Sequence, residues 1–232
     1  MLSSFGIWMF YFSIRSAKEL RLDFALIAGF FLGFAWLTKS PAIFFLTLLP
    51  FTIVFLKREN KIIFIDKNFW RVVFYILITA TIGYLIFNIL RLGPNFHLIS
   101  IRNKDYLFSI NDVLQNPVIQ FIRYGNNIIE WFILLLPFSI SLLSFWAFIK
   151  GIKKYSKEFS FLGLWFLLPL LVQIEFGRVL TARYFLFTLP PLFIILAVYV
   201  SNVLKLRPFH FLAIFFVLII PALVMDFLLL TN

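Results

Sequence analysis

The sequence predicts an all-α fold, a polytopic transmembrane helix bundle, and the observations behind this prediction are its composition and the length of its apolar segments. Of the 232 residues, 62% are hydrophobic, 21% are aromatic and 13% are charged, and the mean hydropathy is +1.00. A water-soluble domain cannot hide that much apolar surface. Several apolar runs reach or approach the ~20 residues that a helix needs to cross a hydrocarbon core of ~30 Å. We therefore expect residues 1–232 to form a single transmembrane domain.

Eight apolar segments follow one another along the chain, which predicts seven or eight membrane segments. They cover residues 2–14, 24–37, 41–56, 72–90, 131–149, 159–174, 184–204 and 209–230. The first segment is too short to span a membrane, and no basic region precedes it as it would in a signal peptide. We therefore expect the chain to begin inside a helix, as the C-terminal part of a longer protein whose earlier helices lie upstream of Met1.

Lysine and arginine residues alternate in density between successive links, which predicts the orientation of the segments. The links after the first, third, fifth and seventh segments hold 14 of the 21 Lys and Arg residues, and the other links hold 7. By the positive-inside rule, the richer links face the cytoplasm. Because the net charge of +11 is spread over short clusters between apolar runs, we expect lipid and no nucleic acid as the partner.

The longest polar stretch, residues 91–130, is then an extracytoplasmic loop and a place for a site. Its candidate residues for contacts to a donor or acceptor are Arg102, Asp105 and Asp112. Apolar residues between Pro117 and Tyr124 predict a short helix that lies flat at the lipid interface and that the glycine and asparagines of residues 125–127 close. The alternative is that this helix is only a membrane-surface anchor.

Lys39 lies between two short apolar segments, where the sequence predicts an extracytoplasmic turn. A lysine costs about 2.5 to 3.5 kcal/mol at the membrane centre and less toward the interface, so a shallow lysine beside a phosphate is favourable. Pro41 supports the turn because it restricts Ser40 to extended geometry and can open the next helix, whose dipole also favours an anion. The alternative is a lysine that extends to water from the tip of the hairpin.

Arg178 and Arg183 lie in a short extracytoplasmic link before a helix that contains two successive prolines at residues 190–191. Two cations at headgroup depth suit a lipid phosphate, because arginine can hold two phosphate oxygens at once. The alternative is that both are interface anchors. The prolines predict a kink near residues 186–187, since they lack the backbone donors of a regular helix.

The carboxylates on the predicted outer side are Asp105, Asp112, Glu130 and Glu175. No pair among them has convincing catalytic spacing, so the general base stays unassigned. We expect Glu175 to pair with Arg178, three residues further on, if that link is helical. His97 and His210 are isolated on opposite sides of the membrane, and cysteine is absent, so we expect no metal site in this chain.

Two stretches carry a family resemblance. The first is GFFLGFAWLTKSP at residues 29–41, and the second is EFGRVLTARYFLFTLPP at residues 175–191. They resemble the GLxLGxAxLTKxP hairpin and the RYxLxxLPPL helix of bacterial glycosyltransferase family 39, in the GT-C superfamily with protein mannosyltransferases and lipid A aminoarabinose transferases. Gly29 and Gly33 also form a GxxxG pattern, which permits close helix packing and often occurs by chance.

The resemblance implies a glycosyltransferase of the cytoplasmic membrane that transfers a sugar from a polyprenyl-phosphate donor to an acceptor outside the cytoplasm. Lys39, Arg178 and Arg183 would then be contacts to the lipid phosphate. The family's catalytic Asp lies upstream of everything present here, so we expect this chain alone to be inactive, with no cofactor of its own. A divalent metal in the complete enzyme and a separately encoded N-terminal half stay open.

Two other functions remain open at this point. A transporter or flippase module for a lipid or small molecule would carry polar residues at mid-membrane depth, and few are present. A noncatalytic membrane scaffold would assemble with a separate partner. The sequence names neither the sugar nor the acceptor.

Overall fold

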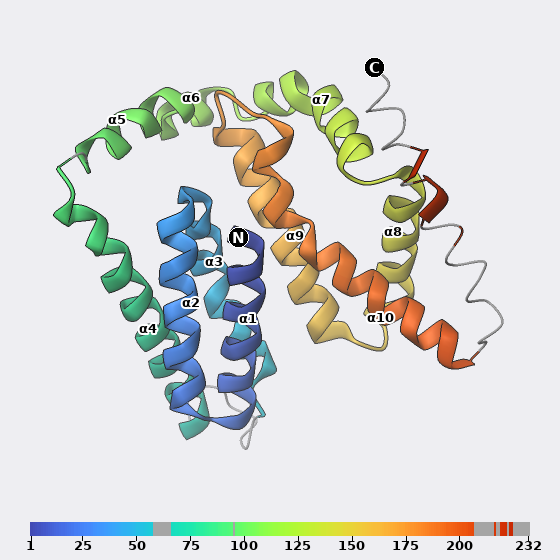
Figure 1. Ribbon diagram of the computed structural model, residues 1–232, viewed down its shortest axis with the longest axis horizontal. Coiled ribbons are helices and arrows are strands. Elements are labelled where there is room, and N and C mark those ends of the chain that lie inside the picture. Colours follow the sequence, from blue (N-terminus) through green and yellow to red (C-terminus); the bar gives the residue numbers. More distant parts are fainter. Residues whose placement is uncertain (58–65, 95, 207–215, 217–218, 222, 225–232) are drawn as a thin grey trace. The chain divides into compact units, whose positions relative to one another are not determined.

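A computed structural model describes residues 1–57, 66–94, 96–206, 216, 219–221 and 223–224 (Figure 1). Over these residues the chain forms helices and, apart from one isolated antiparallel bridge, no extended pairing, which confirms the all-α class. The chain divides into two compact units, Met1–Asn103 and Lys104–Asn232. Each unit packs its own helices.

The first unit is built around three neighbouring helices, α1, α2 and α4, which lie side by side (Figure 1). Its helices within the described residues are α1 (Leu2–Glu19), α2 (Leu22–Thr38), η1 (Ser40–Ala42), α3 (Ile43–Leu48), η2 (Leu49–Phe55), α4 (Lys67–Phe87) and η4 (Asn88–Leu92). The tight turn between α1 and α2 is formed by Leu20, which takes a left-handed backbone conformation (φ 54°, ψ 41°). Tyr75 of α4 donates its hydroxyl hydrogen bond to the Leu20 carbonyl (3.0 Å), so the turn is tied to the third helix.

The GxxxG pair of α2 lies in the contact with α4. A Cβ atom added at Gly29 would lie 2.8 Å from the Cβ atom of Ile82, and one added at Gly33 would lie 2.6 Å from the Cβ atom of Ile86. Real side chains do not approach this closely, so only glycine lets the two helices come together at these positions. The pattern therefore has a packing role in the first unit.

The turn after α2 differs from the sequence expectation at Ser40. The extended residue is Lys39 (φ −159°, ψ 143°), and the 3-10 turn η1 already begins at Ser40. Lys39 takes over the extended geometry because it ends α2, where its backbone N–H still donates to the Ala35 carbonyl (3.2 Å). Pro41 opens the next helical stretch as predicted.

The second unit packs α8, α9 and α10 against one another, and α7 against α9. Its helices within the described residues are α6 (Ile110–Gln115), α7 (Ile119–Leu135), α8 (Phe138–Ile152), α9 (Ser156–Phe176), η5 (Ala182–Tyr184), η6 (Leu186–Thr188) and α10 (Pro190–Leu206). Helix α5 (His97–Tyr106) runs across the division between the units. The polar stretch 91–130 is thus largely helical.

The prediction of a short interfacial helix that closes at residues 125–127 is wrong, because α7 is longer. The helix continues through Gly125 to Leu135, because Ile128, Trp131 and Phe132 pack against the core that α9 provides. The apolar segment 131–149 is also interrupted. Leu136 is extended (φ −137°, ψ 114°), as expected of a residue that precedes a proline, and α8 starts only after Pro137.

Two helical stretches in the described part of the chain are long and apolar enough to cross a membrane, Lys67–Leu92 and Ser156–Phe176. A third would be the pair Ala182–Thr188 and Pro190–Val203, which is bent by 47°. The helices at Leu22–Thr38, Ser40–Phe55 and Ser139–Ile152 are apolar but shorter. These helices are compatible with a membrane protein. Most of the expected segment 209–230 lies outside the described residues.

Candidate functional site

The candidate site lies on the link between α9 and α10, residues 177–189, which we call the arginine link because it carries Arg178 and Arg183. Helix α9 ends at Phe176, and Gly177 is extended (φ −79°, ψ 120°). The chain then pairs with the turn between α5 and α6. Phe108 N donates to Phe176 O (2.8 Å) and Arg178 N donates to Tyr106 O (2.9 Å). The beginning of the arginine link is therefore fixed by two backbone hydrogen bonds.

Helix α7 holds the arginine link from another side. The Tyr124 hydroxyl donates to the Arg178 carbonyl at 2.5 Å. Phe185 is 1% exposed, and its ring centre lies 5.7 Å from that of Trp131 and 6.4 Å from that of Phe132. Burying such a ring contributes roughly 1.5 to 3 kcal/mol. The link is thus anchored at Arg178 and at Phe185, and Arg183 lies two residues before Phe185.

Arg178 faces Asp112 across this anchored turn. Its Nη2 atom lies 3.8 Å from Asp112 Oδ2, and the two side chains are 45% and 50% exposed. Its guanidinium also lies 5.2 Å from the centre of the Phe108 ring. The predicted pair between Glu175 and Arg178 is wrong. The helix ends between them, so a spacing of three residues no longer places both side chains on one face.

Asp112 is held in place by the start of α6. Asp112 N donates to Ser109 Oγ (3.2 Å) and Asp112 Oδ2 accepts from Ser109 N (3.0 Å), a reciprocal capping box. Hydrogen bonding from the side chain and the backbone N–H of Ser109 lowers the pKa of the Asp112 carboxyl, and the charge of Arg178 adds to the same effect. The carboxylate therefore stays charged beside Arg178 at neutral pH.

The lowered pKa of Asp112 predicts a pH-dependent α6. A carboxyl whose folded pKa is depressed stabilises the fold above its ordinary pKa, and this contribution is lost as the pH falls through the folded pKa. We expect the α6 amides to lose hydrogen-exchange protection, corrected for intrinsic rates, as the pH falls from neutral through the carboxyl range. Asp112→Asn should remove this dependence. An unchanged dependence in Asp112→Asn would show that another group controls it.

Arg183 lies on η5, is exposed, and has no ion-pair partner among the described residues. Its guanidinium lies 5.4 Å from the centre of the neighbouring Tyr184 ring. The predicted interruption of the helix is present just after it. The turns η5 and η6 precede α10, which begins at Pro190, and the axis bends by 47°. Because the prolines cannot donate to the preceding turn, they open a helix here and do not kink a continuous one.

The other predicted site residues lie elsewhere. Lys39 is an exposed residue of the first unit and has no ion-pair partner in the described part of the chain. Asp105 is exposed on α5. Arg102 is also on α5, but its side chain is outside the described residues, as is His210. Of the predicted site residues, the structure thus brings Asp112 and Arg178 together.

Sequence reasoning missed the burial of polar atoms at the end of α9. Both carboxylate oxygens of Glu175 and the amide nitrogen of Gln173 are buried and lack hydrogen-bond partners among the described residues. The same holds for Gln120 Oε1 and Thr181 Oγ1. The available signal was the presence of Gln and Glu in the last turn of α9, directly after the apolar run at residues 164–172, where polar residues are costly.

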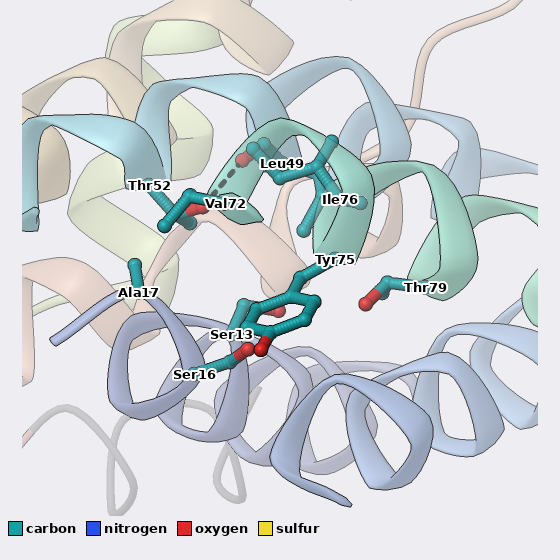
Figure 2. A pocket seen from close by; sticks show the side chains of 9 residues that line it. All are labelled: Ser13, Ser16, Ala17, Leu49, Thr52, Val72, Tyr75, Ile76 and Thr79. Atoms are coloured by element: carbon teal, nitrogen blue, oxygen red, sulfur yellow. Dashed lines mark hydrogen bonds between the residues drawn. The ribbon is translucent and has the colours of Figure 1, made fainter. Parts of the chain in front are cut away.

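A pocket in the first unit has a different character (Figure 2). Its nine lining residues are Ser13, Ser16, Ala17, Leu49, Thr52, Val72, Tyr75, Ile76 and Thr79. It comprises about 190 Å³, part of which is open solvent, and has room for about one water molecule. Its hydroxyls are already engaged: Thr52 donates to Leu49 O (2.7 Å), and Thr79 donates to Ala25 O (2.9 Å). This pocket therefore serves helix packing, not chemistry.

In the described part of the chain, no three His, Cys, Asp or Glu side chains come together as a group that could hold a metal ion. The groups that could take part in chemistry are therefore two exposed guanidinium groups, with buried polar atoms nearby in the sequence. Comparison with known proteins found no matching family model, no matching curated protein and no matching solved structure.

Proposed function

We propose that this chain is the membrane part of a glycosyltransferase that uses a polyprenyl-phosphate sugar, with the arginine link as the contact for the lipid phosphate. The observation that carries the proposal is Arg183, an exposed cation without a described ion-pair partner, on the short turn η5 at the break between two apolar helices. A guanidinium suits phosphate because it can donate two parallel hydrogen bonds. The resemblance of residues 29–41 and 175–191 to glycosyltransferase family 39 supports the same function.

The two arginines take different parts in the proposed reaction. The bond between the sugar's anomeric carbon and the phosphate oxygen breaks, a new bond forms to the acceptor oxygen, and the acceptor's proton leaves to a base. Negative charge grows on the phosphate as the first bond breaks, so a fixed cation stabilises the transition state more than the ground state. Arg178 is partly neutralised by Asp112. Arg183 is therefore the principal phosphate contact.

The proposal places the protein in the cytoplasmic membrane as a multi-pass bundle of seven or eight segments, with the arginine link outside the cytoplasm. The alternation of basic links supports this orientation. The exposure along α7 supports contact with lipid. Gln120 and Tyr124 are each 9% exposed, whereas Ile122 is 76% and Ile129 is 62% exposed. Exposed apolar side chains such as Ile122 and Ile129 are stable where they meet hydrocarbon.

The orientation is tested by single-cysteine labelling, which is clean because the chain contains no cysteine. Asn116 and Ser156 are exposed, and neither position caps a helix through its side chain. We expect Asn116→Cys to react with a membrane-impermeant maleimide in intact cells, and Ser156→Cys to react only after the cells are opened. The opposite pattern would reverse the orientation.

The function is tested by lipid binding. The chain in phospholipid nanodiscs is titrated with polyprenyl phosphate or with neutral polyprenol, and bound lipid is measured by native mass spectrometry. Polyprenyl phosphate should bind at least about tenfold more tightly, the value of roughly one hydrogen bond between charged groups. Arg183→Ala should remove most of this difference. Equal binding of the two lipids to the unaltered chain would contradict the proposal.

A further inference from the structure

The buried polar atoms at the end of α9 have an unbalanced hydrogen-bonding capacity. Glu175 offers two carboxylate oxygens and Gln120 offers one amide oxygen without donors among the described residues, whereas Gln173 offers N–H groups and Thr181 offers one hydroxyl group without partners there. Because each of the three oxygens can accept two hydrogen bonds, the accepting capacity exceeds the donating capacity. A buried carboxylate without a partner is costly, and in an apolar helix such a group marks a site by default. What is missing from this region is a group rich in hydrogen-bond donors.

These residues are close to the arginine link along the chain. Glu175 lies three residues before Arg178, and both oxygens of its carboxylate are buried where α9 ends. Gln120 is one helical turn before Tyr124 on the buried face of α7, and Tyr124 donates to the Arg178 carbonyl. Helix α7 packs against η5 and α9 packs against η6, so the helices that carry these acceptors lie beside the arginine link.

We propose that Glu175 provides a subsite for the hydroxyl groups of the sugar whose phosphate contacts Arg183; this inference rests on the proposed function. A sugar hydroxyl can donate one hydrogen bond, so neighbouring hydroxyls can donate to the two Glu175 oxygens. The carboxylate thus accepts from a polyol with no proton transferred. Glu175 is a binding residue in this arrangement.

The test compares lipids that differ only in the sugar. The nanodisc-embedded chain is titrated with bare polyprenyl phosphate and with polyprenyl phosphates that carry glucose, mannose, galactose, N-acetylglucosamine or arabinose. At least one glycosylated lipid should bind about 10-fold to 100-fold more tightly than the bare lipid, the effect of one hydrogen bond to a charged group. Glu175→Ala should remove this gain and leave binding of the bare lipid unchanged. Glu175→Gln should retain part of it.

The matched control is Glu130→Ala, because Glu130 is exposed on α7 and should not alter the gain. Thermal unfolding without lipid separates a binding role from a structural one. An unpaired buried carboxylate does not stabilise the fold, so Glu175→Ala should unfold at the same temperature as the unaltered chain or higher. A lower unfolding temperature, a gain that survives in Glu175→Ala, or equal binding of all the lipids would overturn the subsite. Failure of bare polyprenyl phosphate to bind would instead contradict the proposed function, and with it the subsite.

Discussion

Replacing Arg183 by Ala is expected to lower sugar transfer about 30-fold to 1000-fold, the effect of losing ~2 to 4 kcal/mol of transition-state stabilisation from one preorganised charge contact. The reason is that Arg183 is exposed, lacks an ion-pair partner among the described residues, and lies two residues before the buried Phe185, which anchors the link. The measurement is turnover of a radiolabelled polyprenyl-phosphate sugar by membranes of the native host, with the substitution introduced into the chromosome.

Two further variants make this result specific. Arg183→Lys should recover only part of the rate, because lysine keeps the charge but loses the planar fork that holds two phosphate oxygens. Lys205→Ala serves as the control, because Lys205 is an exposed cation in the last turn of α10, on the side predicted to be cytoplasmic. All rates are normalised to the amount of folded protein. Near-normal turnover in Arg183→Ala would mean that Arg183 serves only as an anchor at the membrane interface.

Replacing Gly33 by Ala is expected to destabilise the first unit by about 1 to 3 kcal/mol, the usual cost of an overpacked contact. The added Cβ atom would lie 2.6 Å from the Ile86 Cβ atom, so α2 and α4 must move apart. This cost opposes a gain of ~1 kcal/mol in helix propensity. Thermal unfolding in nanodiscs, followed by tryptophan fluorescence, measures the effect; Trp36, one of the six tryptophans, stacks on Phe87 at 4.8 Å.

The matched control is Gly125→Ala on α7. A Cβ atom there meets no atom within 4 Å, so the same substitution should leave stability unchanged or raise it slightly. A Gly33→Ala variant that unfolds at or above the temperature of the unaltered chain would mean that the close contact of α2 and α4 is not required.

The helical class was predictable because it follows from composition and from the length of apolar runs. The positions at which the helices end were not predictable from the sequence. Residues 125–127 carry a local end signal, but the packing of Trp131 and Phe132 on the core of the second unit continues α7 through them. Pro137 then ends the helix inside a run that is apolar throughout. In the first case tertiary contacts outweighed the local end signal, and in the second a single proline outweighed the apolar run.

The two arginines of the candidate site were predictable from the sequence, but their interaction partners were not. Arg178 and Arg183 stand out because they lie between apolar segments. The partner of Arg178 is Asp112, far away in the sequence, and no local spacing indicates that pair. The expected pair with Glu175 assumed a continuous helix. Because α9 ends at Phe176, Glu175 is instead buried without a described partner, which is what makes it a candidate for substrate binding.

The central claim is that the arginine link binds a lipid phosphate, and photocrosslinking tests it most directly. A polyprenyl phosphate with a photoreactive group next to the phosphate is added to membranes that contain the chain, and labelled peptides are identified by mass spectrometry. We predict that residues 177–189 are labelled, that unlabelled polyprenyl phosphate competes and neutral polyprenol does not, and that Arg183→Ala abolishes the labelling. Labelling spread evenly over the apolar helices, or equal competition by polyprenol, would contradict the claim.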